Sequence, residues 1–135
     1  MGHPLSHFSK SNVWKMVVYK EYYINSARFL PNLPKEHICS QQHGHTYNIK
    51  VSVKGAVNPD SGFVIDAFDI DKHFQKVHNE IDHKLLNDIK GLENPTSENI
   101  CIFIWGRLIK DIPDLYQIEI KENNVTGFIY SGEQF

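Results

Sequence analysis

The sequence predicts an α+β fold in which two helices cover one face of a four-stranded antiparallel sheet. Alternating, strand-like segments lie near both ends of the chain, and two helical apolar stripes lie between them. Strands and helices that come in separate runs favour an antiparallel sheet with its helices on one side. The length of 135 residues suits one domain, which we expect at 14–135 after a flexible N-terminal extension at 1–13.

The first strand is predicted to start after Trp14, in a segment rich in β-forming residues that continues through 22–24, and a loop with two prolines follows at 29–38. The clearest alternation in the chain comes next, with His43, His45, Tyr47, Ile49, Val51 and Val53 on one parity. This pattern predicts a half-buried strand with both histidines on its apolar side. After a turn, residues 63–65 are expected to return as the second strand of a hairpin.

Two helices are predicted in the middle of the chain. The first has a stripe of apolar residues at helical spacing, and Asp66 or Asp69 is available as its N-cap. The second starts at the Asn-Pro-Thr-Ser-Glu sequence of 94–98. Its apolar face includes Cys101, which gives that thiol an ordinary core position.

The last part of the sheet is predicted from the alternation around Ile118 and Ile120, with a fourth strand at 126–130 paired to it. Glu122 shares the parity of these isoleucines, so its carboxylate should point toward the face that the helices cover. An unpaired charge there costs several kcal/mol, so such a residue is normally paired or reserved for a ligand. Its two oxygens suit an amino-pyrimidine edge with adjacent N–H donors. The pattern leaves both roles open.

The composition narrows the classes of partner and location. A formal net charge of -2 gives no basic surface for nucleic acid, and no long apolar run indicates a membrane segment. The two cysteines, Cys39 and Cys101, fit a reducing cytoplasm in which both thiols stay free. We therefore expect a cytoplasmic protein with a small-molecule substrate, no nucleic acid and no membrane.

The motif Cys39-x-x-x-His43-Gly44-His45 is the main candidate for chemistry. Two histidines two residues apart on a strand project from the same face, which lets both imidazoles reach one metal ion, although two ordinary half-buried rings fit the pattern as well. Cys39 lies in a polar loop before them, where a thiolate would be both a base and a nucleophile. The alternative for Cys39 is a small core residue.

Asp82 and His83 close the first predicted helix. A histidine held there by a neighbouring carboxylate is suited to carry protons. A histidine that only satisfies the free carbonyls at the helix end explains the local sequence equally well.

Four motifs together resemble the 6-pyruvoyl-tetrahydropterin synthase superfamily, and the similarity runs from about Tyr19 to Glu133. The short gap between the cysteine and the first histidine is similar to the 6-carboxy-5,6,7,8-tetrahydropterin synthase branch of the queuosine pathway. The four motifs are Cys39-x-x-x-His43-Gly44-His45, Gly62-Phe63-Val64-Ile65-Asp66, Asp82-His83 and Lys121-Glu122.

This resemblance implies the tunnelling fold, in which trimers pair into hexamers with active sites between subunits. It implies a lyase that converts 7,8-dihydroneopterin triphosphate to 6-carboxy-5,6,7,8-tetrahydropterin. Cys39 would be the catalytic base, Asp82 and His83 the proton relay, Glu122 the anchor of the pterin ring and Thr96 a second pterin contact. The alternatives are a synthase that forms the 6-pyruvoyl product, or a metal-impaired paralogue that only binds pterin.

The resemblance also implies a zinc site, and here the chain departs from the family pattern. His43 and His45 would be two of three zinc ligands, but Arg28 takes the place of the third histidine. A guanidinium is permanently protonated and has no lone pair for a metal. His37 is the only nearby substitute. We expect weak zinc binding by two histidines, with a metal-free site that uses the charge of Arg28, or an impaired site, as alternatives.

Overall fold

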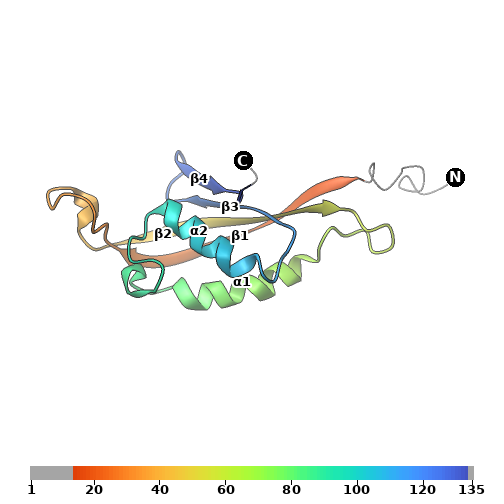
Figure 1. Ribbon diagram of the computed structural model, residues 1–135, viewed down its shortest axis with the longest axis horizontal. Helices are drawn as coiled ribbons and strands as arrows, with labels where there is room; N and C mark the ends of the chain where they lie inside the picture. The colour runs from red at the N-terminus through yellow and green to blue at the C-terminus, as the bar shows by residue number, and fades with distance from the viewer. Residues whose placement is uncertain (1–13, 134–135) are drawn as a thin grey trace.

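The computed structural model describes residues 14–133, so the predicted extension at 1–13 lies outside the described residues. The main elements follow one another as β1 (Lys15–Arg28), β2 (His43–Ala56), α1 (Ala67–Ile81), α2 (Ser97–Leu108), β3 (Leu115–Lys121) and β4 (Gly127–Tyr130). The strands form one antiparallel sheet in the order β1-β2-β3-β4. Figure 1 shows α1 and α2 side by side against one face of this sheet, so the predicted fold class is confirmed.

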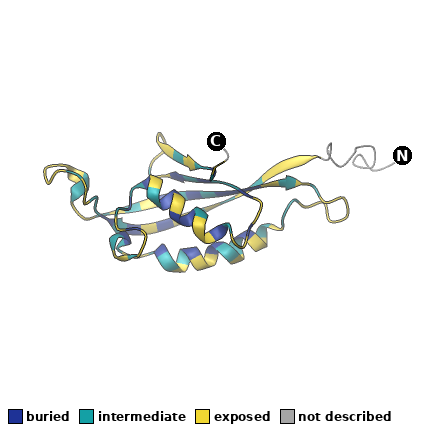
Figure 2. Cartoon of the chain, in the orientation of Figure 1, coloured by how far each residue is buried: buried dark blue, intermediate teal, exposed yellow. Residues whose placement is uncertain are grey.

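Strands β1 and β2 are each 14 residues long and pair from Lys15 opposite Ala56 to Arg28 opposite His43. Because side chains alternate across a strand, one face of the pair carries the buried residues Ile24, Tyr47 and Ile49. Figure 2 shows that the buried residues lie between the sheet and the helices. The predicted parity of β2 is therefore confirmed.

The helices bury the stripes that their sequences predict. In α1 the buried residues are Ile70, Phe74, Val77 and Ile81. In α2 they include Ile100, Cys101, Ile104 and Leu108. Each such side chain contributes roughly 1.5–3 kcal/mol by leaving water. No helix in the described part of the chain is long and apolar enough to span a membrane.

The predicted return strand at 63–65 is wrong. This segment is irregular, because β2 already pairs with β1 on one side and with β3 on the other and has no free edge. The turn before it closes on itself, since the backbone N–H of Asn58 donates to the carbonyl of Phe63 over 2.8 Å. Gly62 supports this turn with a φ of 77°. The segment leads directly into Asp66, which caps α1.

The N-cap of α1 gives a first prediction. The carboxylate of Asp66 accepts a hydrogen bond from the backbone N–H of Phe68 over 2.9 Å, whereas Asp69 lies in the first turn without this role. Asp66→Ala should lower the free energy of unfolding by about 1 kcal/mol. Asp69→Ala should lower it by only about 0.3–1 kcal/mol, through the helix dipole. Urea denaturation of both variants checks this, and a larger loss for Asp69→Ala would contradict the cap assignment.

Candidate active site

The end of the β1–β2 pair brings three of the predicted site residues onto one face. Arg28 lies directly opposite His43, and Ser26 lies opposite His45. Because side chains alternate between the two faces along a strand, Arg28 and both histidines lie on the helix-covered face of the sheet. The ring centroids of His43 and His45 are 4.4 Å apart, with the rings nearly perpendicular. Arg28 thus lies beside the two histidines, as counting along the sequence predicts.

Arg28 is almost completely buried, with 4% of its surface exposed. Its Nη1 donates to the carbonyl oxygen of Pro95 over 3.0 Å, and its Nη2 forms an ion pair with Oε1 of Glu122. The guanidinium carbon also lies 5.4 Å from the ring centre of Tyr47. A buried guanidinium needs a counter-ion and acceptors, and Glu122 and Pro95 supply these to the two Nη groups of Arg28. These contacts fix Arg28 in place.

Glu122 holds the other half of this ion pair. Its Oε1 accepts a second hydrogen bond, from the hydroxyl of Ser97, and its side chain is 21% exposed. Burial raises the pKa of Glu122, but the hydrogen bond from Ser97 and the charge of Arg28 outweigh burial and hold the pKa below its ordinary value. The inward direction predicted for this carboxylate agrees with these contacts.

Thr96 and Ser97 have different roles at the start of α2. The side chain of Thr96 accepts from the backbone N–H of Asn99 over 3.2 Å and so caps the helix. Ser97 is 3% exposed and donates to Glu122. Sequence reasoning selected Thr96 as the substrate contact and missed Ser97. The sequence signal for Ser97 was a second hydroxyl side chain directly after the cap residue, on the side of α2 that faces the sheet.

Asp82 and His83 lie at the end of α1, against β1. Oδ1 of Asp82 accepts from the backbone N–H of Asn25 over 2.9 Å, and Oδ2 lies 2.6 Å from Nδ1 of His83. Burial raises the pKa of Asp82, but these two hydrogen bonds outweigh burial and lower the pKa. The side chain of His83 remains 77% exposed. The predicted pair therefore exists as a carboxylate that orients an accessible imidazole.

The backbone of His83 is also unusual. It has a φ of 55° and is the only non-glycine residue in the described part of the chain with a positive φ. Its N–H donates to the carbonyl of Asn25 over 2.7 Å, and the N–H of Ala27 donates to the carbonyl of Lys84 over 2.9 Å. Leu85 then forms a parallel bridge with Ala27. The segment after α1 is thus fastened to β1, which holds His83 in this conformation.

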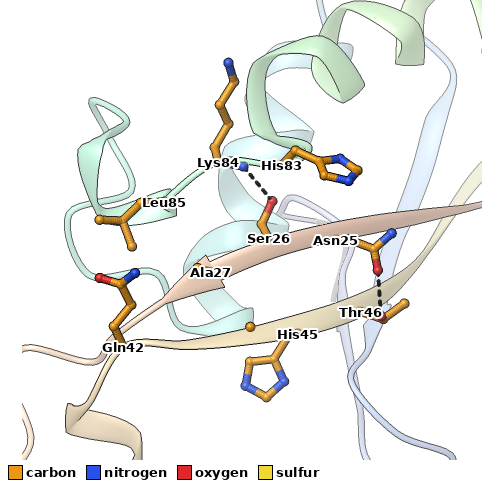
Figure 3. A pocket seen from close by; sticks show the side chains of 10 residues that line it. Asn25, Ser26, Ala27, Gln42, His45, Thr46, His83, Lys84 and Leu85 are labelled. Carbon is orange, nitrogen blue, oxygen red and sulfur yellow. Dashed lines mark hydrogen bonds between the residues drawn. The ribbon is translucent and has the colours of Figure 1, made fainter.

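A groove of about 570 Å³ runs along this edge, lined by residues 25–27, 42, 44–46 and 83–85. Figure 3 shows His45 from β2 and His83 from the segment after α1, both lining this groove. Cys39, Glu122 and Thr96 are not among the residues that line it. The structure therefore brings one predicted zinc histidine and the predicted proton carrier to one surface.

Cys39 lies on a one-turn helix, Ile38–Ser40, within the β1–β2 loop. Figure 1 shows this loop projecting beyond the end of the sheet. The backbone of Cys39 is held by His37, whose Nδ1 accepts from its N–H over 3.0 Å, and by Leu30, whose N–H donates to its carbonyl over 2.8 Å. The thiol is free and partly exposed. His37 is thus engaged at the loop and does not serve as a substitute ligand beside Arg28.

The side chains at the end of β1 and β2 do not fit the zinc site that the resemblance implies. No group of three or more histidine, cysteine or acidic side chains in the described residues is placed to hold a metal ion. Nδ1 of His43 lies 2.6 Å from the carbonyl oxygen of Gln41, and the third position holds the buried, charged Arg28. Burial and the charge of Arg28 lower the pKa of His45. Two imidazoles beside a guanidinium are an incomplete donor set for zinc.

A four-stranded antiparallel sheet with two helices on one face and a groove at the end of its longest strands agree with the tunnelling fold that the resemblance implies. The chain belongs to the 6-pyruvoyl tetrahydropterin synthase family, because the family model of that description matches residues 17–133. This match confirms the superfamily recognised from the sequence motifs and the prediction of a lyase of this type.

Similar proteins cover most of the chain. A 6-pyruvoyl tetrahydrobiopterin synthase of Dictyostelium discoideum is 38% identical over 70% of this chain and 74% of its own. A 6-carboxy-5,6,7,8-tetrahydropterin synthase of Synechocystis is 34% identical over 84% of this chain and 92% of its own. The solved structure of 6-pyruvoyl tetrahydropterin synthase from Caenorhabditis elegans is 26% identical, with a TM-score of 0.83 over 90% of this chain and 98% of that one.

The Arg28–Glu122 ion pair gives a prediction for stability. Glu122→Gln leaves the charge of Arg28 buried without its counter-ion, which should lower the free energy of unfolding by about 3 kcal/mol. The matched control is Glu80→Gln, which breaks an exposed ion pair with Arg107 and should cost less than about 1 kcal/mol. Urea denaturation at neutral pH compares the two variants.

The contribution of the Arg28–Glu122 ion pair to the free energy of unfolding should depend on pH. The pKa of Glu122 is lower in the folded chain than in the unfolded one, so its stabilisation is complete above the unfolded pKa and is lost as pH falls through the folded pKa. The difference between the wild type and Glu122→Gln should therefore shrink in acid. A difference that stays constant into strong acid would contradict the ion pair.

Proposed function

We propose that the chain is a lyase that converts 7,8-dihydroneopterin triphosphate to 6-carboxy-5,6,7,8-tetrahydropterin in queuosine biosynthesis. The observation that carries this proposal is the groove at the end of the longest strands, which is lined both by His45 and by His83, whose ring Asp82 orients. The Synechocystis relative, whose match spans nearly the whole domain, supports the choice of product.

The proposed chemistry gives each predicted residue a task. Glu122 accepts hydrogen bonds from the amino-pyrimidine edge of the pterin. Its Oε2 is available for this task, because it has no partner among the described residues. The thiolate of Cys39 takes a proton from the substrate side chain. Triphosphate and a two-carbon aldehyde leave, and a water molecule supplies the second oxygen of the 6-carboxylate. His83 carries protons to and from the reacting atoms while Asp82 holds its ring. Zinc has no part in these steps, because the donor set does not fit it.

We also propose that the enzyme works as a homo-oligomer, a trimer or hexamer with sites between subunits. Neither Cys39 nor Glu122 lines the groove of its own chain, so in this proposal a neighbouring subunit brings these groups to the groove. The sheet face without helices carries exposed apolar side chains such as Val17, Tyr19 and Tyr23, which suit contact with another copy. The two free cysteines support a reducing location, the cytoplasm.

A synthase that forms the 6-pyruvoyl product is the second candidate, favoured by the 38% identity to the Dictyostelium relative. The two reactions differ in whether acetaldehyde is released from the substrate. A third candidate, a pterin-binding protein without catalysis, has no use for Cys39 or for the oriented pair of Asp82 and His83. Incubation with dihydroneopterin triphosphate separates the three by product and by released aldehyde.

The role of Cys39 can be tested by removing its thiol. Cys39→Ala should lower turnover by at least about a hundredfold and leave neopterin affinity nearly unchanged, because the thiolate acts in the transition state. Cys101→Ala is the matched control, since it removes the buried thiol of α2 and should keep turnover. Single-turnover assays and fluorescence titration measure the two quantities. Unchanged turnover in Cys39→Ala would remove this residue from the mechanism.

The role of Glu122 can be tested by pterin binding. Glu122→Ala should weaken the binding of neopterin by about 2–5 kcal/mol, because it removes the charged acceptor of the ring. Glu119→Ala is the matched control, since Glu119 lies on the same strand with opposite parity and pairs with Lys50. Equilibrium titration of both folded variants, checked by circular dichroism, decides the matter. Wild-type affinity in Glu122→Ala would refute the anchor.

A further inference from the structure

Arg28 occupies the position where the family pattern has a metal ligand, and the structure shows how it is used instead. The side chain is 4% exposed and contacts the carbonyl of Pro95, the carboxylate of Glu122 and the ring of Tyr47. These partners come from the segment before α2, from the end of β3 and from β2. The guanidinium is therefore a fixed part of the site, and its charge is permanent at any physiological pH.

We propose that Arg28 replaces the metal as the fixed positive charge of this site and positions Glu122 for the ligand, so that pterin binding needs no divalent metal. The nature of the ligand rests on the function proposed above. The argument for the charge itself rests on the contacts of Arg28 and on the donors around it.

The positioning of Glu122 follows from how its two oxygens are used. Oε1 accepts from both Nη2 of Arg28 and the hydroxyl of Ser97. A carboxylate oxygen has about two acceptor sites, so these two donors fill Oε1 and fix the direction of the carboxylate. Oε2 has no partner among the described residues, and the side chain is 21% exposed. Arg28 and Ser97 thus present one oxygen of Glu122 to a ligand N–H.

The atoms around Arg28 are poorly suited to zinc. Three buried polar atoms here have no hydrogen-bond partner, namely Nε of Arg28, Nε2 of His45 and the hydroxyl of Tyr47. Nε of Arg28 has no lone pair to give, and a tyrosine hydroxyl is not among the groups that usually bind zinc in proteins. Nε2 of His45 is then the only atom of the three with a lone pair of the kind that zinc takes. A second positive charge would also lie against the guanidinium.

The test measures metal content and neopterin binding in the full-length chain. Wild-type protein, dialysed against EDTA and then against buffer with equimolar zinc, should retain less than about 0.1 zinc per subunit, and its Kd for neopterin should agree within about twofold in the two buffers. Arg28→His should retain about one zinc per subunit after the same treatment, because the third imidazole completes the donor set. Fluorescence titration and atomic absorption give the two readouts.

Further variants separate positioning from simple stability. Arg28→Gln should raise the Kd for neopterin by about tenfold, since the carboxylate loses its charged donor. Arg28→Lys, which keeps the charge, should recover part of that loss. Arg107→Gln, which removes an exposed arginine on α2, is the matched control and should bind as the wild type does. If a variant does not fold, the zinc content and the neopterin Kd of the wild-type protein still test the inference.

The outcomes are distinct. One zinc per subunit held by the wild-type chain through chelation, or wild-type affinity in a folded Arg28→Gln, would overturn the inference. A wild-type chain that binds no neopterin would instead overturn the proposed function. The zinc contents of the wild type and Arg28→His would still test whether Arg28 excludes the metal.

Discussion

A guanidinium cannot give up its charge, so burying Arg28 obliges the fold to bring acceptors to it. The acceptors come from residues that are distant from Arg28 in the sequence, namely the carbonyl of Pro95 and the carboxylate of Glu122. The same carboxylate also accepts a hydrogen bond from Ser97. Three separate elements are thereby tied to the end of β1. The position of the α2 N-terminus and the direction of Glu122 depend on this one buried charge. Together with burial, the same charge lowers the pKa of His45.

The regular elements could be predicted where their periodicity is long and self-consistent. The alternation of β2 and the apolar stripes of α1 and α2 reflect burial directly, and the parity of Glu122 correctly gave its direction. The segment 63–65 misled the prediction, because β-propensity is local whereas a strand needs a free edge to pair with. The last residues of β1 are polar, and their strand conformation comes from pairing with β2 and with the segment after α1.

The sequence could propose residues for the candidate site, but it could not predict the contacts that these residues make. Sequence patterns selected the histidines, the Asp82–His83 pair and Glu122, yet the partner of Glu122 lies 94 positions away in the chain. Two adjacent hydroxyls follow Pro95, and only the tertiary position of Glu122 decides that Thr96 caps the helix while Ser97 binds the carboxylate. The sequence places Arg28 where the family pattern has a metal ligand, but the ion pair of Arg28 with Glu122 emerges only from the folded chain.

In the proposed mechanism, the left-handed backbone at His83 sets the stability of the fold against the use of its imidazole. A side chain in this conformation costs roughly 1 kcal/mol that glycine would not incur. Selection for stability alone would therefore favour glycine at this position, and an engineered glycine here would be a stabilising change that removes the imidazole. Such a trade-off, in which a less stable residue is retained where a better folder exists, is typical of positions that serve a reaction rather than the scaffold.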